Sequence, residues 1–362
     1  MDFKKRFSPM TDPRDIRKIS HLLTDIVGLT IIGVIAGCEG YEDIEEFGKT
    51  KHEWLKQYLQ LPEGIPSHDT IERLFESINP DEFQFCFSLW VQETFGLSDE
   101  RFLHVDGKSN RRSGNKYKGQ KMLHTVSVFA GEKHLSIAQL KVDEKSNEIT
   151  AIEPLLESLE ITDKVISIDA MGCQKEIAKT IADKKGYYVL AVKDNQKTLH
   201  DEIESAFKTT AIAHTHTSVE KDHGRIEERT CSVITDLRFI DEAVSWAALY
   251  CIICIVSKRT IGDKTTIETR YFISNMEQNA KFFLEAIRSH WGIENRLHWV
   301  LDILFHEDYC RKNKDNAAEN FNIVRKMALN IIRAFKGDTK SLRRRRLNAG
   351  WNDDYLKQLL TF

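Results

Sequence analysis

Hydrophobic positions follow two different periods in the two parts of this chain. Up to about residue 95 they recur at helical spacing, and the segment 25–36 is apolar almost all round, which predicts a helix inside a bundle. The proline-rich run 62–66 interrupts this region, and Ser67 is expected to be the N-cap of the next helix. The pattern therefore predicts a small all-α domain over residues 1–97, which could bind DNA.

From residue 101 the period changes, and strands alternate with helices. The predicted elements, in order, are strands 102–106, 122–130 and 134–142, helix 149–159, strand 164–169, helix 173–185 and strand 187–192. Three antiparallel strands, a helix and then strand–helix–strand is the order of the ribonuclease-H-like fold. In that fold the first and fourth strands are neighbours. We therefore expect an α/β domain over residues 98–362 with a ribonuclease-H-like mixed sheet.

A β-rich insertion of about residues 195–277 is predicted to interrupt this domain. Strand-like runs at 225–234, 247–258 and 265–273 follow one helical segment. Cys251 and Cys254 lie within an apolar run, which favours a buried strand over a zinc knuckle. The polar stretch around His214 and His216 is expected to be a solvated loop. Helical spacing resumes over 279–290 and again over 317–335.

Charge is nearly balanced, with 52 lysines and arginines, 55 aspartates and glutamates, and a formal net charge of −3. This balance argues against a uniformly basic DNA coat, although local basic patches can bind phosphates. Seven scattered cysteines and the lack of a secretion signal suggest reduced thiols. The most apolar segment, 26–38, is much shorter than the ~20 residues of a membrane-spanning helix. We therefore expect a cytoplasmic, nucleoid-associated protein that is not bound to a membrane.

Three carboxylates are the candidate catalytic residues. Asp106 and Asp169 stand at the ends of the first and fourth predicted strands, which the fold order makes neighbours. Glu294 lies in a segment that can be helical, where His298 and Asp302 share its face. Taken singly, Asp106 could be a turn residue, Asp169 a helix cap and Glu294 a surface residue. Taken together, they can hold divalent metal for phosphodiester chemistry.

Basic side chains near these carboxylates are candidate DNA contacts. Residues 108–121 carry six cations and no acidic residue, and they directly follow the first catalytic strand. The candidates are Lys108, Arg111, Arg112, Lys116, Lys118 and Lys121 in this loop, and Arg288, His290 and His298 around Glu294. The run 343–346 of four arginines is a further candidate phosphate contact, with a solvated helix face as the alternative.

The segments that carry these residues resemble bacterial insertion-sequence transposases of the DDE class, in particular the H-repeat-associated group. The resemblance rests on HVDGK at 104–108, SIDAM at 167–171, VKDNQ at 192–196, HGRIE at 223–227 and HWGIEN at 290–295, together with GIPSHDT at 64–70. Each motif alone is modest, but their order and spacing are specific and cover nearly the whole chain.

The resemblance implies that Asp106, Asp169 and Glu294 form the catalytic and metal-binding triad. It also implies Mg²⁺ as cofactor, with Mn²⁺ as a substitute, and double-stranded DNA as partner, bound by a homodimer at the element's terminal repeats and at target DNA. Related transposases place a tyrosine, an arginine and a lysine around the glutamate where this chain has Ile287, His290 and Leu301. The DNA-contact roles of those positions therefore do not transfer.

The leading hypothesis is a DNA transposase that cuts and joins the ends of an insertion sequence. The first alternative is a catalytically silent, DNA-binding transposon remnant, and the second is a nuclease or phosphatase without strand transfer. The intact carboxylates argue against the first alternative. The basic loop and the additional helical region favour long DNA over a small phosphate ester.

Overall fold

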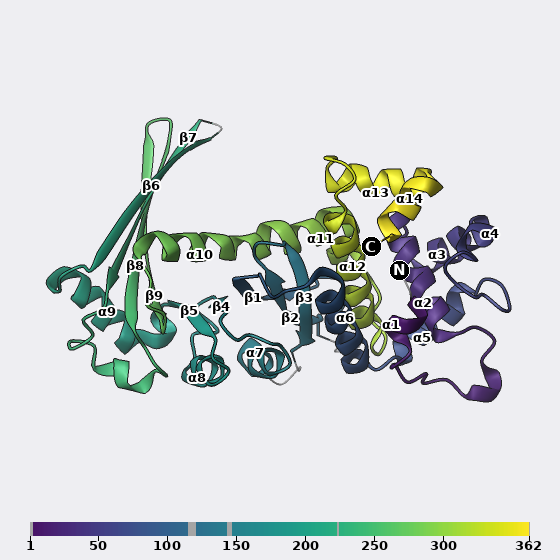
Figure 1. Ribbon diagram of the computed structural model, residues 1–362, viewed down its shortest axis with the longest axis horizontal. Helices are drawn as coiled ribbons and strands as arrows, with labels where there is room; N and C mark the ends of the chain where they lie inside the picture. Colours follow the sequence, from purple (N-terminus) through teal and green to yellow (C-terminus); the bar gives the residue numbers. More distant parts are fainter. Residues whose placement is uncertain (1–2, 115–120, 143–146, 223, 362) are drawn as a thin grey trace.

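One mixed sheet runs through the computed structural model, which describes residues 3–114, 121–142, 147–222 and 224–361. Its strands are β1 Phe102–Ser109, β2 His124–Ala130, β3 Leu135–Lys141, β4 Val165–Ile168, β5 Tyr187–Val192, β6 His214–Asp222, β7 Arg225–Ile234, β8 Cys251–Ile261 and β9 Lys264–Ser274. These nine strands lie in the order β3-β2-β1-β4-β5-β9-β8-β7-β6 (Figure 1). The protein is therefore a mixed α/β structure.

Helices flank the sheet and form a bundle at one end of it (Figure 1). The α-helices are α1 Phe3–Phe7, α2 Leu23–Ala36, α3 Tyr41–Thr50, α4 His52–Leu55, α5 His68–Ser77, α6 Pro80–Phe95, α7 Glu148–Glu157, α8 Lys175–Asp183, α9 Lys197–Thr209, α10 Ala280–Gly292, α11 Trp299–Phe305, α12 Ala317–Ala334, α13 Leu342–Trp351 and α14 Asp353–Leu360. Short 3₁₀ turns are η1 Ile16–Lys18, η3 Asp194–Gln196, η4 Asp241–Ser245 and η6 Glu307–Tyr309, and a π-helical segment is η5 Ile293–His298.

The pairing of β1 with β4 confirms that the first and fourth strands of the core are neighbours. The two strands are parallel, with Val105 opposite Ile168. Side chains of β1 alternate between two packed faces, as strand geometry requires. Leu103 and Val105 join the core under α7 and α8, whereas Phe102 joins the cluster under α10. Residues of β1 with even numbers, Asp106 among them, therefore face the α10 side.

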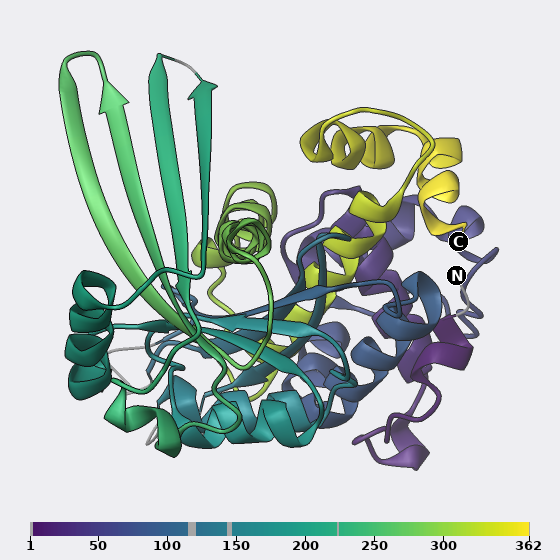
Figure 2. The same ribbon diagram turned by 60° about the vertical axis from the view of Figure 1, so that its left-hand side comes forward.

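The insertion consists of two long hairpins, β6–β7 and β8–β9, which extend side by side beyond the core (Figure 2). The expected loop around His214 and His216 was wrong, because these residues belong to β6 at the edge of the sheet. The sequence of β6 has almost no alternation of apolar and polar residues, which is the usual signal of a strand. The strand is held by backbone pairing with β7 along its full length. Cys251 and Cys254 are buried in β8, which confirms the strand prediction.

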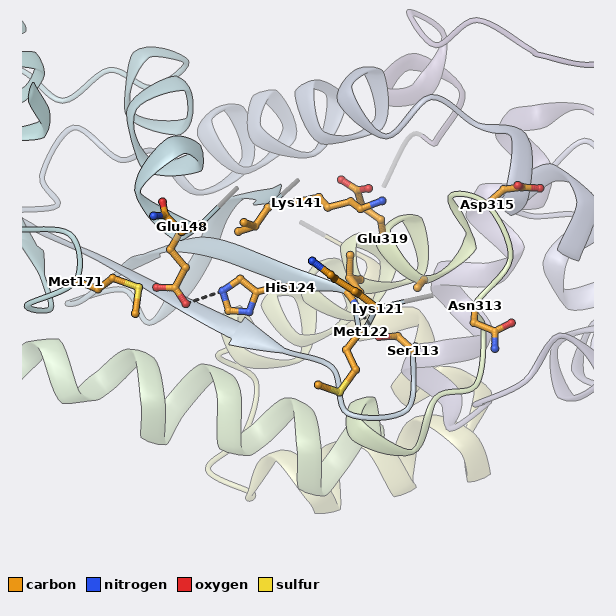
Figure 3. A pocket seen from close by; sticks show the side chains of 14 residues that line it. Ser113, Lys121, Met122, His124, Lys141, Glu148, Met171, Asn313, Asp315 and Glu319 are labelled. Carbon is orange, nitrogen blue, oxygen red and sulfur yellow. Dashed lines mark hydrogen bonds and ion pairs between the residues drawn. The ribbon is translucent and has the colours of Figure 1, made fainter. Parts of the chain in front are cut away.

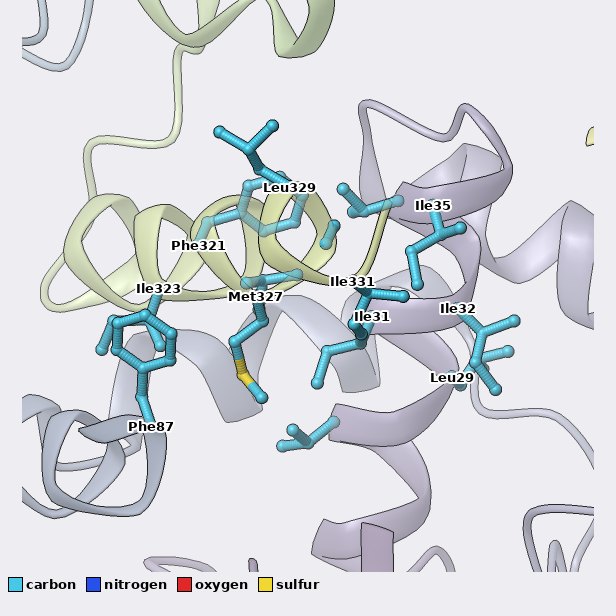
Figure 4. Packing of buried hydrophobic residues seen from close by; sticks show 14 of the residues in the cluster. Leu29, Ile31, Ile32, Ile35, Phe87, Phe321, Ile323, Met327, Leu329 and Ile331 are labelled. Atoms are coloured by element: carbon cyan, nitrogen blue, oxygen red, sulfur yellow. The ribbon is translucent and has the colours of Figure 1, made fainter. Parts of the chain in front are cut away.

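The N-terminal helices share one hydrophobic core with the C-terminal helices. Ile31 and Ile35 of α2 pack in the same cluster as Phe321 and Met327 of α12 (Figure 4). Asn320 of α12 donates hydrogen bonds to the carbonyls of Phe75 and Ile78. The first helices therefore bury their apolar surface against the end of the chain. The division into domains at residue 97 stays a prediction.

The helix α5, which follows Ser67 in the region that could bind DNA, packs inward. Ser67 caps it by accepting a hydrogen bond from the Thr70 amide, as predicted, and Ile71, Leu74 and Phe75 are buried. Two of its exposed positions, Asp69 and Glu72, are acidic. This charge is unfavourable for contact with phosphates.

Two of the four arginines at 343–346 point into the protein, whereas Arg343 and Arg344 are exposed. Arg345 donates a hydrogen bond to the carbonyl of Ile332 near the end of α12, and Arg346 donates to those of Val34 in α2 and Leu304 in α11. Cations at helix C-termini satisfy free carbonyls and interact favourably with the helix dipole. Arg345 and Arg346 thus bind carbonyls near the ends of α12, α2 and α11.

Within the described ranges, no single helix is long and apolar enough to cross a membrane. One pair, α2 with α3, meets the length and composition criteria only jointly, with a bend of 93° between the two helices. The helix α2 is buried along nearly its whole length.

Candidate active site

Two aspartates stand at the same edge of the core sheet. Asp106 lies on β1, and Asp169 directly follows β4. Because Val105 pairs with Ile168, the parallel register brings the next residue of each strand to the same level. Asp169 accepts hydrogen bonds from the amides of Met171 (3.1 Å) and Gly172 (3.3 Å), which fix its carboxylate at the start of the following turn.

Glu294 reaches the two aspartates from the helical side. It lies in η5, a widened π-helical turn that joins α10 to α11. Such turns are rare inside helices and occur often at functional sites. The three carboxylates, from β1, β4 and η5, line one cavity of about 480 Å³ that extends towards β9.

His298 adds a nitrogen to this group of carboxylates. Its Nδ1 is 3.4 Å from Oδ2 of Asp106 and 3.6 Å from Oε2 of Glu294. One ligand atom from each of these three residues lies within 4.8 Å of the others. From its sequence, His298 was expected to contact DNA. In the structure, its side chain is buried beside the carboxylates. Only the shared face with Glu294 signalled this position in the sequence.

Burial and like charge oppose ionisation in this cluster. The pKa of Asp106 is raised first by burial and then by the neighbouring Glu294 and Asp169. The pKa of Asp169 is also raised, with burial as the main cause. The pKa of Glu294 is lowered instead, first through its contact with His298. A bound cation would relieve the repulsion between the carboxylates.

The donor set fits a divalent metal. Oδ2 of Asp106 is buried and accepts no hydrogen bond from any described residue, and Nε2 of His298 likewise has no partner among them. Carboxylate oxygens are the preferred ligands of Mg²⁺, and imidazole nitrogen suits transition metals. The residues present here can therefore hold a divalent ion.

A chain of three side chains, with His104 and Ser167 buried and His290 partly buried, links the elements that carry the carboxylates. Ser167 Oγ is 2.6 Å from His104 Nδ1 and 2.8 Å from His290 Nδ1. A hydroxyl can donate one hydrogen bond and accept another, so it can join both rings. Burial lowers the pKa of His104 and lowers that of His290 to about 4, so both rings are neutral at pH 7.

Each member of this chain precedes one of the three carboxylates by a few residues in the sequence. His104 comes two residues before Asp106, Ser167 two before Asp169, and His290 four before Glu294. Hydrogen bonds behind a metal site commonly orient its ligands. The bond of His290 to Ser167 thus holds the helix turn before Glu294 against β4, and the ring lines the carboxylate cavity, so its DNA-contact role stays a prediction.

Lys108 does not extend into a DNA-binding loop. It pairs with Asp302 and with the buried Glu307, and its side chain is only 13% exposed. These two partners lie on α11 and η6, so the pairs connect β1 to the segment that follows Glu294. The sequence does not indicate these ion pairs, because the partners of Lys108 are about 200 residues away in the chain.

The other basic candidates are dispersed. Arg111 is exposed and pairs with Asp308, Arg112 lies over the ring of Tyr309, and Arg288 pairs with Glu220 of β6. Lys116 and Lys118 lie outside the described residues. Lys121 lines a separate cavity of about 300 Å³, in which Glu148 contacts His124 at 2.5 Å (Figure 3).

A larger, basic groove lies beside the carboxylates. It has a volume of about 940 Å³ and runs between α10 and one face of β7, β8 and β9. Two glutamates, Glu227 and Glu268, and seven arginines and lysines line it: Arg225, Arg229, Lys258, Arg259, Arg270, Arg288 and Arg296. It shares Arg270 and Trp291 with the carboxylate cavity, so the two adjoin.

Two family models match successive parts of the chain. Residues 4–91 match the model described as DDE_Tnp_1-associated, and residues 92–331 match the transposase DDE domain. The second match includes Asp106, Asp169 and Glu294.

Similar proteins extend over the whole length. The chain is 40% identical to "H repeat-associated putative transposase YhhI" of Escherichia coli K12, over 99% of this chain and 98% of that protein. It is 39% identical to "Putative transposase YncI" of Escherichia coli O157:H7, over 98% and 93%. A solved piggyBac transposase synaptic complex with hairpin DNA aligns with a TM-score of 0.49 and 10% identity, over 99% of this chain and 81% of that chain. With a transposase model matched over residues 92–331 and a relative matched almost end to end, the chain belongs to the DDE transposase family.

Proposed function

We propose that this protein is a DNA transposase that cuts and joins the ends of an insertion sequence, with a ribonuclease-H-like catalytic core. The observation that carries the proposal is the meeting of Asp106, Asp169 and Glu294 in one cavity, from two adjacent parallel strands and a helix on the same face of the sheet. Family membership supports the same activity. The expected location is the nucleoid in the cytoplasm.

The residues that would hold metal are the three carboxylates. Asp106 stands between the other two and is suited to be shared, with Asp169 and Glu294 each completing one site. Two Mg²⁺ ions, for which Mn²⁺ can substitute, would activate the attacking hydroxyl and stabilise the leaving oxygen of a phosphodiester. Water is the expected nucleophile for cleavage, and the released DNA 3′-hydroxyl is expected to attack target DNA.

The chain's own residues orient this chemistry. The amides of Met171 and Gly172 hold Asp169, and the His104–Ser167–His290 chain ties both strands to the helix that carries Glu294. The neutral rings of this chain add no positive charge that would compete with a metal. The carboxylates therefore remain available to the metal.

The basic groove is the proposed path of DNA to the carboxylates. Its cations can neutralise phosphates, and because it adjoins the carboxylate cavity, a strand bound along it would pass close to the reacting centre. Several of its arginines already pair with glutamates inside the protein, such as Arg270 with Glu268. Binding would exchange these exposed pairs for phosphate contacts. Because transposition joins two ends, a homodimer on DNA is expected.

Arg259→Ala is expected to weaken binding of duplex DNA about equally for all sequences. Arg259 is half exposed in the groove, and its only described ion pair, with Glu227, is long at 3.8 Å. Loss of one phosphate contact should reduce the slope of log K against log[salt] by about 1. Arg17→Ala removes the same charge from an exposed site on η1 and should leave both quantities unchanged. Equal effects of the two variants would exclude the groove as the binding path.

Cleavage of a labelled duplex that carries the element's own ends tests the function. We expect nicking at those ends with Mg²⁺ and none with EDTA. Cleavage without regard to the ends would favour a general nuclease. Folded protein that binds the ends but never cuts them would be a silent remnant.

A further inference from the structure

His298 is placed where a metal ligand would stand. It is 4% exposed, and its Nδ1 is within 3.6 Å of carboxylate oxygens from both Asp106 and Glu294. The neighbouring Oδ2 of Asp106 is a buried acceptor without a described donor. The two distances are longer than good N–H···O hydrogen bonds, which cluster near 2.9 Å. The ring nitrogen therefore lies beside both carboxylates without making a good hydrogen bond to either.

An ordinary core role explains this arrangement less well. A buried histidine normally has at least one hydrogen-bond partner for its ring, as His104 has in Ser167. His298 Nε2 has no partner among the described residues. The nearby cation Lys108 contacts only the backbone carbonyl of His298 and pairs with Asp302 and Glu307 instead. The carboxylates thus lack a strong side-chain partner on this side.

We propose that His298 is a direct ligand of the divalent metal held by Asp106 and Glu294, and that its nitrogen makes this site prefer Mn²⁺ to Mg²⁺. The inference rests on the proposed function, because it concerns the metal of the same site. Mg²⁺ favours all-oxygen ligand sets and near-ideal octahedral geometry. Imidazole nitrogen binds transition metals better, so one nitrogen in the set shifts the preference. Asp169 lies outside this three-residue group, so any second metal site would remain all-oxygen.

Pulsed electron paramagnetic resonance of the Mn²⁺-loaded full chain tests the proposal without any turnover. A directly bound imidazole gives a nitrogen coupling to Mn²⁺, and ¹⁵N-histidine labelling of the unmodified protein should change that coupling. We expect the coupling to disappear in His298→Gln. His306→Gln is the matched control. His306 is an exposed histidine whose ring contacts Glu39, which is far from the proposed ligands in the sequence. It should keep the coupling.

Metal affinity gives a second readout. His298→Gln should lower the affinity for Mn²⁺ by at least about tenfold, with a smaller change for Mg²⁺. Asp106→Asn separates a test of the metal centre from a test of the His298 ligand, because this variant should remove Mn²⁺ binding at the site altogether.

Three outcomes are decisive. A histidine coupling lost only in His298→Gln establishes the ligand. Mn²⁺ binding that depends on Asp106 but has no histidine coupling, or a coupling that survives in His298→Gln, overturns the inference and leaves the proposed function intact. A lack of Asp106-dependent Mn²⁺ binding overturns the metal centre itself and with it both proposals.

Discussion

Asp169→Asn is expected to abolish metal-dependent cleavage of end DNA while DNA binding is largely retained. Asparagine has nearly the same shape, and its carbonyl oxygen can still accept the hydrogen bonds from Met171 and Gly172. It lacks the negative charge that a hard cation needs. Loss of about 4 kcal/mol of transition-state stabilisation corresponds to roughly a 10³-fold slower reaction, which is our lower expectation.

The measurement is single-turnover cleavage of labelled ends alongside a binding titration with the same duplex. Asp183→Asn is the matched control, since Asp183 is an exposed aspartate on α8 that pairs with Lys179. The control should cut at the normal rate. Unchanged cleavage by Asp169→Asn would mean that the active site lies elsewhere, and parallel loss of binding would point to a structural role.

Phe321→Ala is expected to destabilise the protein by about 3–5 kcal/mol. Phe321 of α12 is 1% exposed, and its ring lies 5.6 Å from Tyr41 and 6.2 Å from Phe75, both in the N-terminal helices. The substitution would leave a cavity at the joint between the two ends of the chain. The loss is a large part of the 5–15 kcal/mol that stabilises a typical protein.

Urea denaturation followed by circular dichroism measures this loss, and hydrogen exchange locates it. Faster exchange in α3 and α5, as well as in α12, is expected because these helices share one core. Phe85→Ala on α6 is the control, since Phe85 is 62% exposed and its removal should change stability by less than about 0.5 kcal/mol. Protection of α3 and α5 that is unaffected in Phe321→Ala would mean that residues 1–97 fold independently.

The core strands and the two aspartates at their ends could be predicted because they depend on local signals, whereas the addition of the insertion hairpins to the same sheet was not predicted. The apolar runs of β1, β4 and β5 have the length and bounds of buried strands, and Asp106 and Asp169 each follow one of them. Parallel neighbours then bring strand ends together whatever their side chains are. The edge strand β6 gave no such signal, since polar residues fill both of its faces.

The surroundings of the site could not be predicted, because they depend on segments far apart in sequence. Lys108 looked like part of a basic loop, yet Glu307 and Asp302 bury it. His298 looked like a phosphate contact, yet the turn of η5 aims it at Asp106. In the sequence, Arg345 and Arg346 cannot be told from Arg343 and Arg344. Only the structure shows that Arg345 and Arg346 bind carbonyls near helix ends.

The joining of both chain ends in one core delays folding during synthesis. Asn320 closes a hydrogen bond with Phe75, 245 residues earlier. At ~5–20 residues per second, a ribosome needs roughly 12–50 s to cover that distance. During that time the apolar surface of the first helices is not yet covered by α12. Glu294 can join the two aspartates only shortly before α12 is made. A nascent chain therefore cannot bring the three carboxylates together before Glu294 has been made, and a product that ends before α12 leaves apolar surface of the first helices uncovered.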